Sequence, residues 1–519
     1  MVFCPNCGSS FNDGTKFCSK CGAKLPAQPA AEQAPAAEPV IQAEPIVRQA
    51  KKEKKEAPKL NLNPKLIAIA AAALVAVILL ITFIPKIFSG GGSITMRKDY
   101  VRAGIIDDEL IGFGKSGKVV KMDFDNTLEG GGMSADGSKL LMVDSEGIMY
   151  IFDGSKFNKI AEGVKKYLLS FDGTGVAYTD EDNALYLYNG GKAKKIAEDI
   201  KTLNVISPDG KAVGYTKESN DTVRGYFYDG KERELGKNMT PYALSAKGTY
   251  VYYKNKDGVL YVQKGENSDD RQKIGDSIDY AILNADGTQI LANVKTDDGT
   301  RTYFSAKGGE RQEVSKTALK ILLPGRAMKD SRFAGVKDLK SQLYYTYNSS
   351  DGYAVYKLNS KLETSSCVKN AFSLTLQEDG KTITYLKNDK LYLMNTSASS
   401  PEGKQLAAEV DSYLSSVDGK LFLYENEEKE TFTVNTSGKS QKVIGESVSE
   451  WAAVGSGFVY IIDEELYFTS GGKGSKVSGF SDEAKDLMGY RDYVLIQGED
   501  EATYMTKDGK KIIKIAESK

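Results

Sequence analysis

The chain of 519 residues contains no histidine. Without imidazole, Ser-His-Asp and Cys-His catalysis, histidine-ligated metal sites and histidine pH switches are all excluded. Tryptophan is nearly absent as well, because Trp451 is the only one in the sequence. An excess of charge of either sign is also lacking. The 69 Lys and Arg residues are balanced by 70 Asp and Glu residues, so the net charge of −1 gives no basic signature for nucleic-acid binding.

Cysteine is scarce and unevenly placed. Four of the five cysteines lie within the first 25 residues, and the fifth, Cys367, stands alone far downstream. The four form two C-x-x-C-G knuckles, Cys4-Pro5-Asn6-Cys7-Gly8 and Cys18-Ser19-Lys20-Cys21-Gly22. Glycine permits the positive φ that such tight turns need. Residues 11–17, between the knuckles, can form a short hairpin with Asp13-Gly14 at its bend.

Four thiolates directed at one point make a closed tetrahedral site that suits structural zinc. We therefore predict Cys4, Cys7, Cys18 and Cys21 as zinc ligands. A closed site has no open position for a substrate, and so short a segment would fold through metal binding. Two disulfides in a secreted module, or a redox C-x-x-C, are less favoured alternatives. Residues 1–25 resemble the short N-terminal zinc ribbons of bacterial membrane proteins, and this resemblance implies the same zinc-binding role for the four cysteines.

An apolar segment follows the cysteine region. Residues 26–63 are rich in Ala, Pro, Glu and Gln and lack aromatics, so we interpret them as a disordered tether. Residues 64–88 contain LIAIAAAALVAVILLITFI at positions 66–84. These 19 uncharged residues would span about 28 Å as a helix, close to the hydrocarbon thickness of a bilayer. A buried soluble helix is rarely apolar on every face, and a signal peptide would lie at the N-terminus, so we predict one transmembrane helix.

The charges around this segment predict its orientation. Seven Lys and Arg residues lie between positions 48 and 65, whereas Lys86, Arg97 and Lys98 follow the segment. The positive-inside rule then places the N-terminus in the cytoplasm and the C-terminal region outside it, at the cell membrane. The cysteine pairs would face a reducing compartment, where disulfides are rare. Residues 89–99, which begin with SGGGS, are expected to form a flexible spacer.

Residues 100–519 repeat one pattern of short apolar strands and turns. Each clear unit carries an S-x-D-G-like turn before a strand, as in Ser207-Pro208-Asp209-Gly210. The turn residues are Asp136, Asp172, Asp209, Lys247, Asp286, Asp379 and Asp418. Consecutive clear units are 36 to 39 residues apart, and the 93 residues from Asp286 to Asp379 must hold one extra unit that includes residues 339–359. This period, with four short strands per unit, is typical of propeller blades.

The turns resemble those of TolB-like and WD-type propellers, although the G-H…W-D signature is absent. We therefore predict a mainly β fold, a multi-bladed β-propeller after a small zinc ribbon and one transmembrane helix. About ten units can be counted, with further strands possible in residues 100–125. Ordinary propellers have four to eight blades. One large ring and two smaller propellers, parting near Leu323-Pro324-Gly325, both stay open.

The repeats carry no pattern that points to catalysis. An aspartate before glycine stabilises a turn, and the acidic tip Asp180-Glu181-Asp182-Asn183 lacks the full calcium-loop pattern. Strands rich in tyrosine, such as Leu185-Tyr186-Leu187-Tyr188, are explained by packing between blades, with phenol groups at the edge. We interpret Cys367 as an incidental thiol.

We expect a binding protein and not an enzyme: a propeller anchored outside the membrane that binds an envelope component or a protein partner, and no nucleic acid. Two alternatives are an extracytoplasmic glycan- or peptide-processing enzyme with a carboxylate pair, and a structural envelope scaffold. The sequence does not identify the ligand.

Overall fold

The computed structural model describes residues 2–3, 10–11, 94–96 and 101–516, apart from gaps at 107–108, 115–117, 266, 326, 399–401, 444–447, 491–492 and 500–501. The predicted tether and transmembrane helix lie outside the described residues. Among the described residues, no helix is long and apolar enough to cross a membrane. Residues 1–38 and 39–519 form two separate compact units.

The first unit contributes two described strands. β1 (Val2–Phe3) and β2 (Ser10–Phe11) pair antiparallel, with Val2 opposite Phe11 and Phe3 opposite Ser10. The hairpin predicted with its bend at Asp13-Gly14 lies outside the described residues.

The second unit consists of small antiparallel sheets, each built from consecutive strands. We number these sheets as blades in chain order. Blade 1 is β3 (Arg102–Ile106), β4 (Glu109–Phe113) and β5 (Val119–Asp123); blade 2 is β6 (Leu128–Met133), β7 (Leu140–Asp144), β8 (Met149–Phe152) and β9 (Phe157–Ala161); blade 3 is β10 (Lys166–Leu169), β11 (Val176–Thr179), β12 (Leu185–Tyr188) and β13 (Lys194–Ala197). Blade 4 is β14 (Ile200–Ile206), β15 (Val213–Ser219), β16 (Thr222–Tyr228) and β17 (Glu232–Lys237); blade 5 is β18 (Thr240–Leu244), the 3-10 turn η1 (Ala246–Gly248), β19 (Tyr250–Lys254), β20 (Leu260–Lys264) and β21 (Asn267–Gly275).

The remaining blades follow in the same way. Blade 6 is β22 (Ile278–Leu283), β23 (Gln289–Thr296), β24 (Gly299–Ala306) and β25 (Gln312–Ser315); blade 7 is β26 (Lys320–Leu322), β27 (Leu343–Asn348), β28 (Gly352–Leu358) and the first part of β29 (Thr364–Leu376); blade 8 is the rest of β29, β30 (Thr382–Lys387), β31 (Lys390–Asn395) and β32 (Lys404–Ala408). Blade 9 is β33 (Ser412–Ser415), β34 (Leu421–Glu425), β35 (Thr431–Asn435) and β36 (Ser440–Lys442); blade 10 is β37 (Glu450–Val454), β38 (Gly457–Ile462), β39 (Glu465–Thr469) and β40 (Ser475–Lys476); blade 11 is β41 (Ala484–Gly489), β42 (Val494–Gly498), β43 (Thr503–Thr506) and β44 (Ile512–Ala516).

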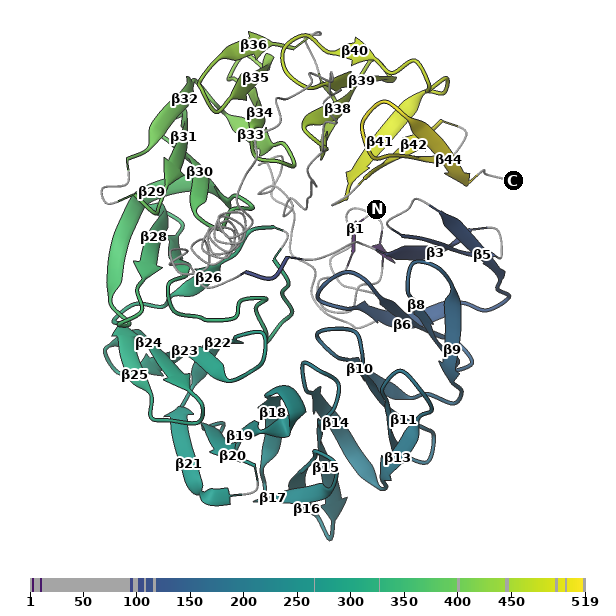
Figure 1. Ribbon diagram of the computed structural model, residues 1–519, viewed down its shortest axis with the longest axis vertical. Helices are drawn as coiled ribbons and strands as arrows, with labels where there is room; N and C mark the ends of the chain where they lie inside the picture. The colour runs from purple at the N-terminus through teal and green to yellow at the C-terminus, as the bar shows by residue number, and fades with distance from the viewer. Residues whose placement is uncertain are drawn as a thin grey trace, which may run out of the picture. The chain divides into compact units, whose positions relative to one another are not determined.

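The eleven described blades form one closed ring (Figure 1). An apolar cluster fills each seam between neighbours; Val459 of blade 10 and Val494 of blade 11, for example, belong to the same cluster. The ring closes where Phe113 of blade 1 packs with Leu495 and Met505 of blade 11. The alternative of two smaller propellers is therefore wrong. The extra unit predicted between Asp286 and Asp379 is confirmed, and it is blade 7.

Strand order within a blade follows from burial. The first strand of each complete blade is the innermost, and the S-x-D-G turn or its equivalent joins it to the second strand (Figure 1). Second strands are flanked by strands on both edges and by blades on both faces, so they are almost entirely apolar and buried. β11 and β38, for example, bury every residue. This matches the expectation for strands covered on both faces.

A long connection occupies the inside of the ring. Residues 323–342, which we call the strap, stand between β26 and β27, where other blades have a short turn. Phe333 of the strap pairs with Leu283 of blade 6 and meets the ring of Phe171 of blade 3 edge to face, with 5.9 Å between centroids. Arg332 donates a hydrogen bond of 3.3 Å to the carbonyl of Asn204 in blade 4. The irregular stretch that begins at Leu323 therefore bridges several blades of one ring.

Residues 94–96 join the strap from the other side. Ile94 pairs with Val336 and Met96 with Ala327, both within the strap. Met328 donates its backbone N–H to the carbonyl of Thr95 at 3.0 Å. The chain just before blade 1 is thus held at the strap.

Candidate functional site

The predicted zinc ligands Cys4, Cys7, Cys18 and Cys21 all lie outside the described residues. Of this region the structure describes only β1 and β2, whose antiparallel register brings residues 3 and 10 opposite each other. Four thiols and no histidine or carboxylate partner make a donor set that fits a closed zinc site. Among the described residues, no group of three or more potential ligands could hold a metal ion.

The turn aspartates hold their own turns together. In blade 2, Asp136 Oδ1 accepts hydrogen bonds from Ser134 Oγ at 2.7 Å and from the backbone N–H of Ser138 at 3.0 Å. Blade 3 repeats the arrangement, with Asp172 Oδ1 accepting from Ser170 Oγ at 2.8 Å. The interpretation of these carboxylates as scaffold is confirmed.

The turns of neighbouring blades also contact one another. Ala135 N–H donates to the carbonyl of Phe171 at 3.0 Å, and Ala246 N–H donates to that of Asp286 at 2.8 Å. Lys247, which replaces aspartate in blade 5, takes a positive φ of 58° and donates its N–H to Asp209 Oδ1 at 3.1 Å. The turns therefore form a continuous row on one side of the ring, which we call the turn face.

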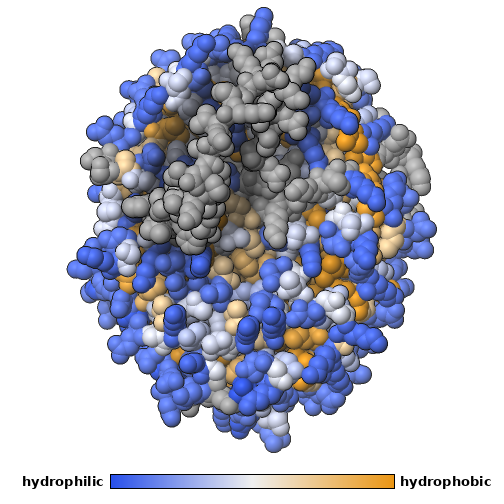
Figure 2. All heavy atoms as spheres, viewed as in Figure 1, coloured by the Kyte–Doolittle hydropathy of each residue, from blue (hydrophilic) through white to orange (hydrophobic). Residues whose placement is uncertain are grey.

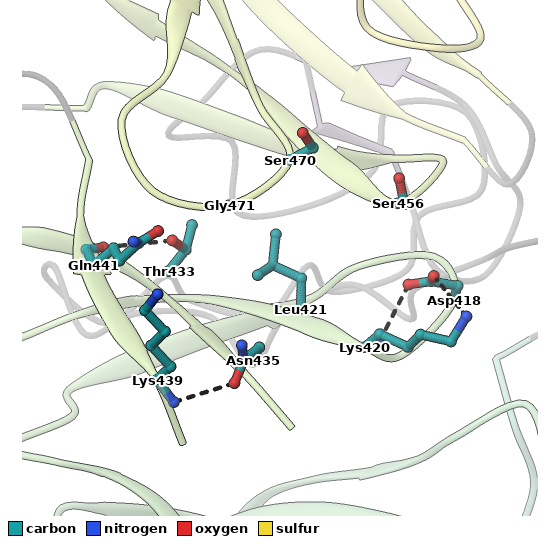
Figure 3. Close-up of a pocket in the computed structure, with 10 residues that line it drawn as sticks. All are labelled: Asp418, Lys420, Leu421, Thr433, Asn435, Lys439, Gln441, Ser456, Ser470 and Gly471. Carbon is teal, nitrogen blue, oxygen red and sulfur yellow. Dashed lines mark hydrogen bonds and ion pairs between the residues drawn. The ribbon is translucent and has the colours of Figure 1, made fainter. Parts of the chain in front are cut away.

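A polar pocket opens at the seam between blades 9 and 10 (Figure 3). We call it the seam pocket, and it has a volume of about 290 Å³. Blade 9 supplies its S-x-D-G turn and the turn between β35 and β36, and blade 10 supplies the turn between β37 and β38 and the turn between β39 and β40. The lining residues are Asp418, Lys420, Leu421, Thr433, Asn435, Lys439, Gln441, Ser456, Ser470 and Gly471. Because Asp418 belongs to the row of S-x-D-G turns, the pocket lies on the turn face.

Two lysines line the seam pocket, and only one of them has a carboxylate partner among the described residues. Asp418 Oδ1 accepts from Ser416 Oγ at 2.9 Å, and Asp418 Oδ2 lies 3.3 Å from Lys420 Nζ, so this carboxylate is neutralised locally. Lys439 donates its backbone N–H to Asn435 Oδ1 at 3.1 Å. No described acid lies within ion-pair distance of the Lys439 ammonium group. The pocket therefore offers a cation together with hydroxyl and amide groups.

A second pocket, of about 310 Å³, lies between blades 2 and 3. Its lining includes the carboxylates of Glu129, Asp144, Glu146 and Glu181. Asp144 is 1% exposed, and both of its oxygens are occupied: Oδ1 accepts the backbone N–H groups of Glu146 and Ile148, and Oδ2 accepts Asn126 Nδ2 at 3.1 Å. Asp144 thus acts as a turn-holding residue within this acidic pocket.

Tyrosines of the third strands stack on tyrosines of the second strands. Tyr186 stacks on Tyr178 with 5.1 Å between ring centroids, and Tyr467 stacks on Tyr460 at 5.6 Å. Both are directly opposite pairs in the ladder. Burial raises the pKa of Tyr460 to about 12. The tyrosine pattern is confirmed as packing within and between blades.

Cys367 lies on β29, where blades 7 and 8 share that strand. Its thiol is unbridged and half-buried against the cluster of Val355 and Val368. Burial raises the pKa of the thiol, which opposes thiolate formation. The geometry agrees with an incidental thiol.

Comparison with known proteins identifies one part of the chain. Residues 3–25 match the family described as the zinc-ribbon domain. The N-terminus is a zinc-ribbon domain. This match covers the two knuckles quoted above and agrees with the prediction of zinc binding in this segment. No curated protein matches the chain.

Several solved structures are distantly similar to the chain. They include a eukaryotic initiation factor (11% identity, TM-score 0.39, covering 66% of this chain and 96% of that one) and TolB from Acinetobacter baumannii (12% identity, TM-score 0.24, covering 50% and 76%). Oligogalacturonate lyase from Vibrio parahaemolyticus is a third, with 12% identity, a TM-score of 0.26 and coverage of 67% and 100%. None of these likenesses extends to function.

Proposed function

We propose that this chain is a single-pass membrane protein whose extracytoplasmic propeller binds a polar, anionic component of the cell envelope, with a zinc ribbon on the cytoplasmic side. The observation that carries the binding role is the seam pocket on the turn face. Its size suits a small polar unit, such as one residue of a polymer.

The chemistry of the seam pocket favours a ligand with an anionic group. Lys439 is exposed and has no acidic partner within ion-pair distance among the described residues, so an incoming phosphate or carboxylate would supply one. Ser456, Ser470 and Gln441 can donate hydrogen bonds to oxygen atoms of the same ligand, while the apolar Leu421 side chain lines the pocket. The ligand would orient by these bonds, and no bond-breaking step follows from them.

The anchoring rests on the sequence of residues 64–88 and on the excess of basic residues before it. In the same arrangement, the zinc ribbon faces the reducing compartment, where Cys4, Cys7, Cys18 and Cys21 would hold zinc. Bound zinc would supply the folding free energy of residues 3–25, which are too few to form a hydrophobic core.

Binding can be tested with two polymers of defined chemistry. Purified full-length protein is expected to bind poly(glycerol phosphate) and not neutral dextran of the same length. Lys439→Gln should weaken this binding about tenfold, since one charge-assisted contact is lost. Lys192→Gln is the matched control, because Lys192 lies in the corresponding turn of blade 3, away from the seam pocket. Equal loss in both variants, or equal binding of both polymers, would refute the proposal.

The membrane topology needs a separate experiment. A membrane-impermeant amine reagent added to intact cells should label lysines of residues 101–516 and leave those of residues 1–65 unlabelled until lysis. Labelling in the reverse order would contradict the orientation without affecting the polymer result.

A second candidate function rests on the acidic pocket between blades 2 and 3. An extracytoplasmic hydrolase would need two carboxylates on either side of a scissile bond, and Glu129, Glu146 and Glu181 are the side chains there that could supply them. Turnover of an envelope glycan or peptide that is abolished by Glu146→Gln would favour this enzyme over the binding protein.

A further inference from the structure

Ile94, one of the first described residues of the second unit, lies at the turn face. It pairs antiparallel with Val336 of the strap, whose carbonyl accepts the N–H of Ala285 in the turn of blade 6 at 2.9 Å. On its other side, Ile94 contacts the turn of blade 8, because a β-carbon on Gly380 would lie 2.8 Å from Ile94 Cδ1. The chain therefore reaches the propeller between the turns of two blades.

The length of the preceding chain limits how far the turn face can be from the membrane. Residues 89–93 are the only ones between Ile94 and the segment 64–88 that we propose as the membrane anchor. An extended chain covers at most about 3.6 Å per residue, so residues 88 and 94 are at most about 22 Å apart. An inner strand of six residues, such as β22, is itself about 20 Å long. A path through the ring or around it to the opposite face would use the whole link, so the turn face must be the one nearer the bilayer.

Antiparallel pairing divides the loops of each complete blade between two faces. The second strand runs away from the turn face and the third strand returns to it, so the turn between the third and fourth strands also lies at the turn face. The hairpin between the second and third strands and the connection to the next blade lie at the opposite end. We call that end the far face. The charges of the two faces can therefore be compared loop by loop.

Exposed lysines mark the turn face of blades 9, 10 and 11. The turn between the third and fourth strands supplies Lys439 in blade 9, Lys473 in blade 10, and both Lys510 and Lys511 in blade 11. We call these four residues the lysine row. The ammonium group of Lys510 lies 5.6 Å from the centre of the Phe468 ring of blade 10, so the row continues across the seam between blades 10 and 11.

The acids close to the lysine row are engaged within the propeller. Asp508 Oδ1 accepts the backbone N–H groups of Lys510 and Lys511 at 2.9 and 2.8 Å. Asp418 lies 3.3 Å from Lys420, and Figure 3 shows Asp418 and Lys439 on opposite sides of the seam pocket. No acid in the described part of the chain forms an ion pair with a lysine of the row. This sector of the turn face therefore carries a net positive charge.

The far face of the same blades is acidic. Its hairpins expose Glu427 in blade 9, Asp463 and Glu464 in blade 10, and Glu499 in blade 11. Lys485 lies at this face too, but its ammonium group is 2.7 Å from a carboxylate oxygen of Glu464. The same three blades thus carry opposite charges at their two ends. An anionic surface would attract the turn face and repel the far face.

The geometry points to the turn face of blades 9–11 as a docking surface for the anionic lipid headgroups of the membrane that anchors the chain. The short link holds this face within reach of the bilayer, and the lysine row would lie against the lipid phosphates. Each basic residue close to an anionic membrane favours the docked state roughly fivefold. A ligand in the seam pocket would then be held near the membrane surface. This inference rests on the single-pass anchor of the proposed function and adds which face of the propeller meets the lipid.

Energy transfer to labelled lipid headgroups can measure the docking. Full-length protein is reconstituted into vesicles of phosphatidylcholine alone, or of phosphatidylcholine mixed equally with phosphatidylglycerol. A donor dye is attached to azidophenylalanine in place of Ser437, in the turn after β35, or of Glu427, in the hairpin before it. In mixed vesicles, transfer should be stronger from position 437 than from position 427. The difference should shrink in phosphatidylcholine vesicles, and also in high salt, which screens charges.

A charge reversal in the lysine row tests which residues hold the surface to the lipid. The triple variant Lys473→Glu, Lys510→Glu and Lys511→Glu should lower the ratio of docked to undocked molecules by about a hundredfold or more. Transfer from position 437 in mixed vesicles should then fall to its level in phosphatidylcholine vesicles. Lys439 stays unchanged in this variant, so the lysine that lines the seam pocket is retained.

The matched control makes the same change of net charge on the far face. Lys316, Lys320 and Lys369 are exposed there, at the connections on either side of blade 7. Replacing all three by glutamate should leave transfer from position 437 unchanged. An equal effect of the two triple variants would show that net charge, and not the lysine row, governs the result, and would overturn the proposal.

Flotation of the vesicles in high salt tests the anchor separately. Loss of the full-length protein from phosphatidylcholine vesicles under this condition would refute the single-pass anchor, and the docking surface would fall with it. Retention of the protein, together with equal transfer from positions 427 and 437 in mixed vesicles, would overturn the docking surface alone and leave the anchor standing.

Discussion

Ring closure depends on Phe113, and its removal offers the sharpest test of the fold. Phe113 is 7% exposed and packs at the seam between blades 1 and 11. Its ring meets that of Tyr493 edge to face, with 5.3 Å between centroids. Replacing a buried phenylalanine by alanine costs about 3–5 kcal/mol, of which an aromatic pair contributes about 0.5–1.5 kcal/mol. Because Phe113 retains slight exposure, we expect about 3 kcal/mol for Phe113→Ala.

Hydrogen exchange followed by mass spectrometry can locate this loss. In a closed ring, opening the seam exposes two blades that lie at opposite ends of the sequence. Exchange should therefore accelerate in both β3–β5 and β41–β44, by about a hundredfold for 3 kcal/mol when exchange follows the opening equilibrium. The blades far from the seam should be unaffected.

Phe227→Ala is the matched control. Phe227 is fully buried in the cluster between blades 4 and 5. Its loss should accelerate exchange in β14–β21 alone, which are adjacent in the sequence. If Phe113→Ala accelerates exchange in blade 1 and leaves blade 11 unchanged, the seam does not hold the ring closed and our reasoning fails.

Three further predictions concern pH and metal. Tyr413 is buried, which raises its pKa to about 12, and its hydroxyl donates to the carbonyl of Thr384 at 3.1 Å. The folded state keeps this phenol neutral while the unfolded chain ionises near pH 10, so Tyr413 alone should lower the free energy of unfolding by about 2–3 kcal/mol as the pH rises from 10 to 12. Alkaline denaturation of Tyr413→Phe should show a smaller fall, and an equal fall would contradict this assignment. Burial also raises the pKa of Asp330 in the strap. The folded pKa of this carboxyl group lies above its unfolded value, so the strap should be most stable at acid pH and should lose stability as the pH rises through the folded pKa. Asp330→Asn should therefore slow proteolysis of the strap at pH 7 and not at pH 4. Metal analysis of the full chain should find about one zinc ion per chain, and the Cys4→Ser variant should contain none. The melting temperature of the propeller should be the same in both proteins, because the two units are separate. A metal-free wild-type protein would refute the prediction of zinc binding.

Much of the propeller could be predicted from local patterns. Ser134, Asp136 and Gly137 specify a turn through short-range hydrogen bonds and a positive φ of 70° at the glycine. The apolar strands that follow such turns have no helical period, and their regular recurrence predicts blades. The poorly matching unit near residues 339–359 could still be located, because the spacing of its neighbours left room for it.

The candidate sites were less accessible to sequence reasoning. The seam pocket combines residues of two blades, among them Lys439 and Ser470, and neither residue stands in a recognisable motif.

The amino-acid sequence by itself determined the repeated blade, its turns, and the cysteine pattern of the zinc ribbon, because each depends on residues close together in the chain. Only the tertiary structure decided that the eleven described blades make one ring and that the strap lies inside it. Closure requires Phe113 to meet Leu495 across nearly the whole described chain. Such a contact depends on the small rotation at every seam between blades, and no local pattern encodes that sum.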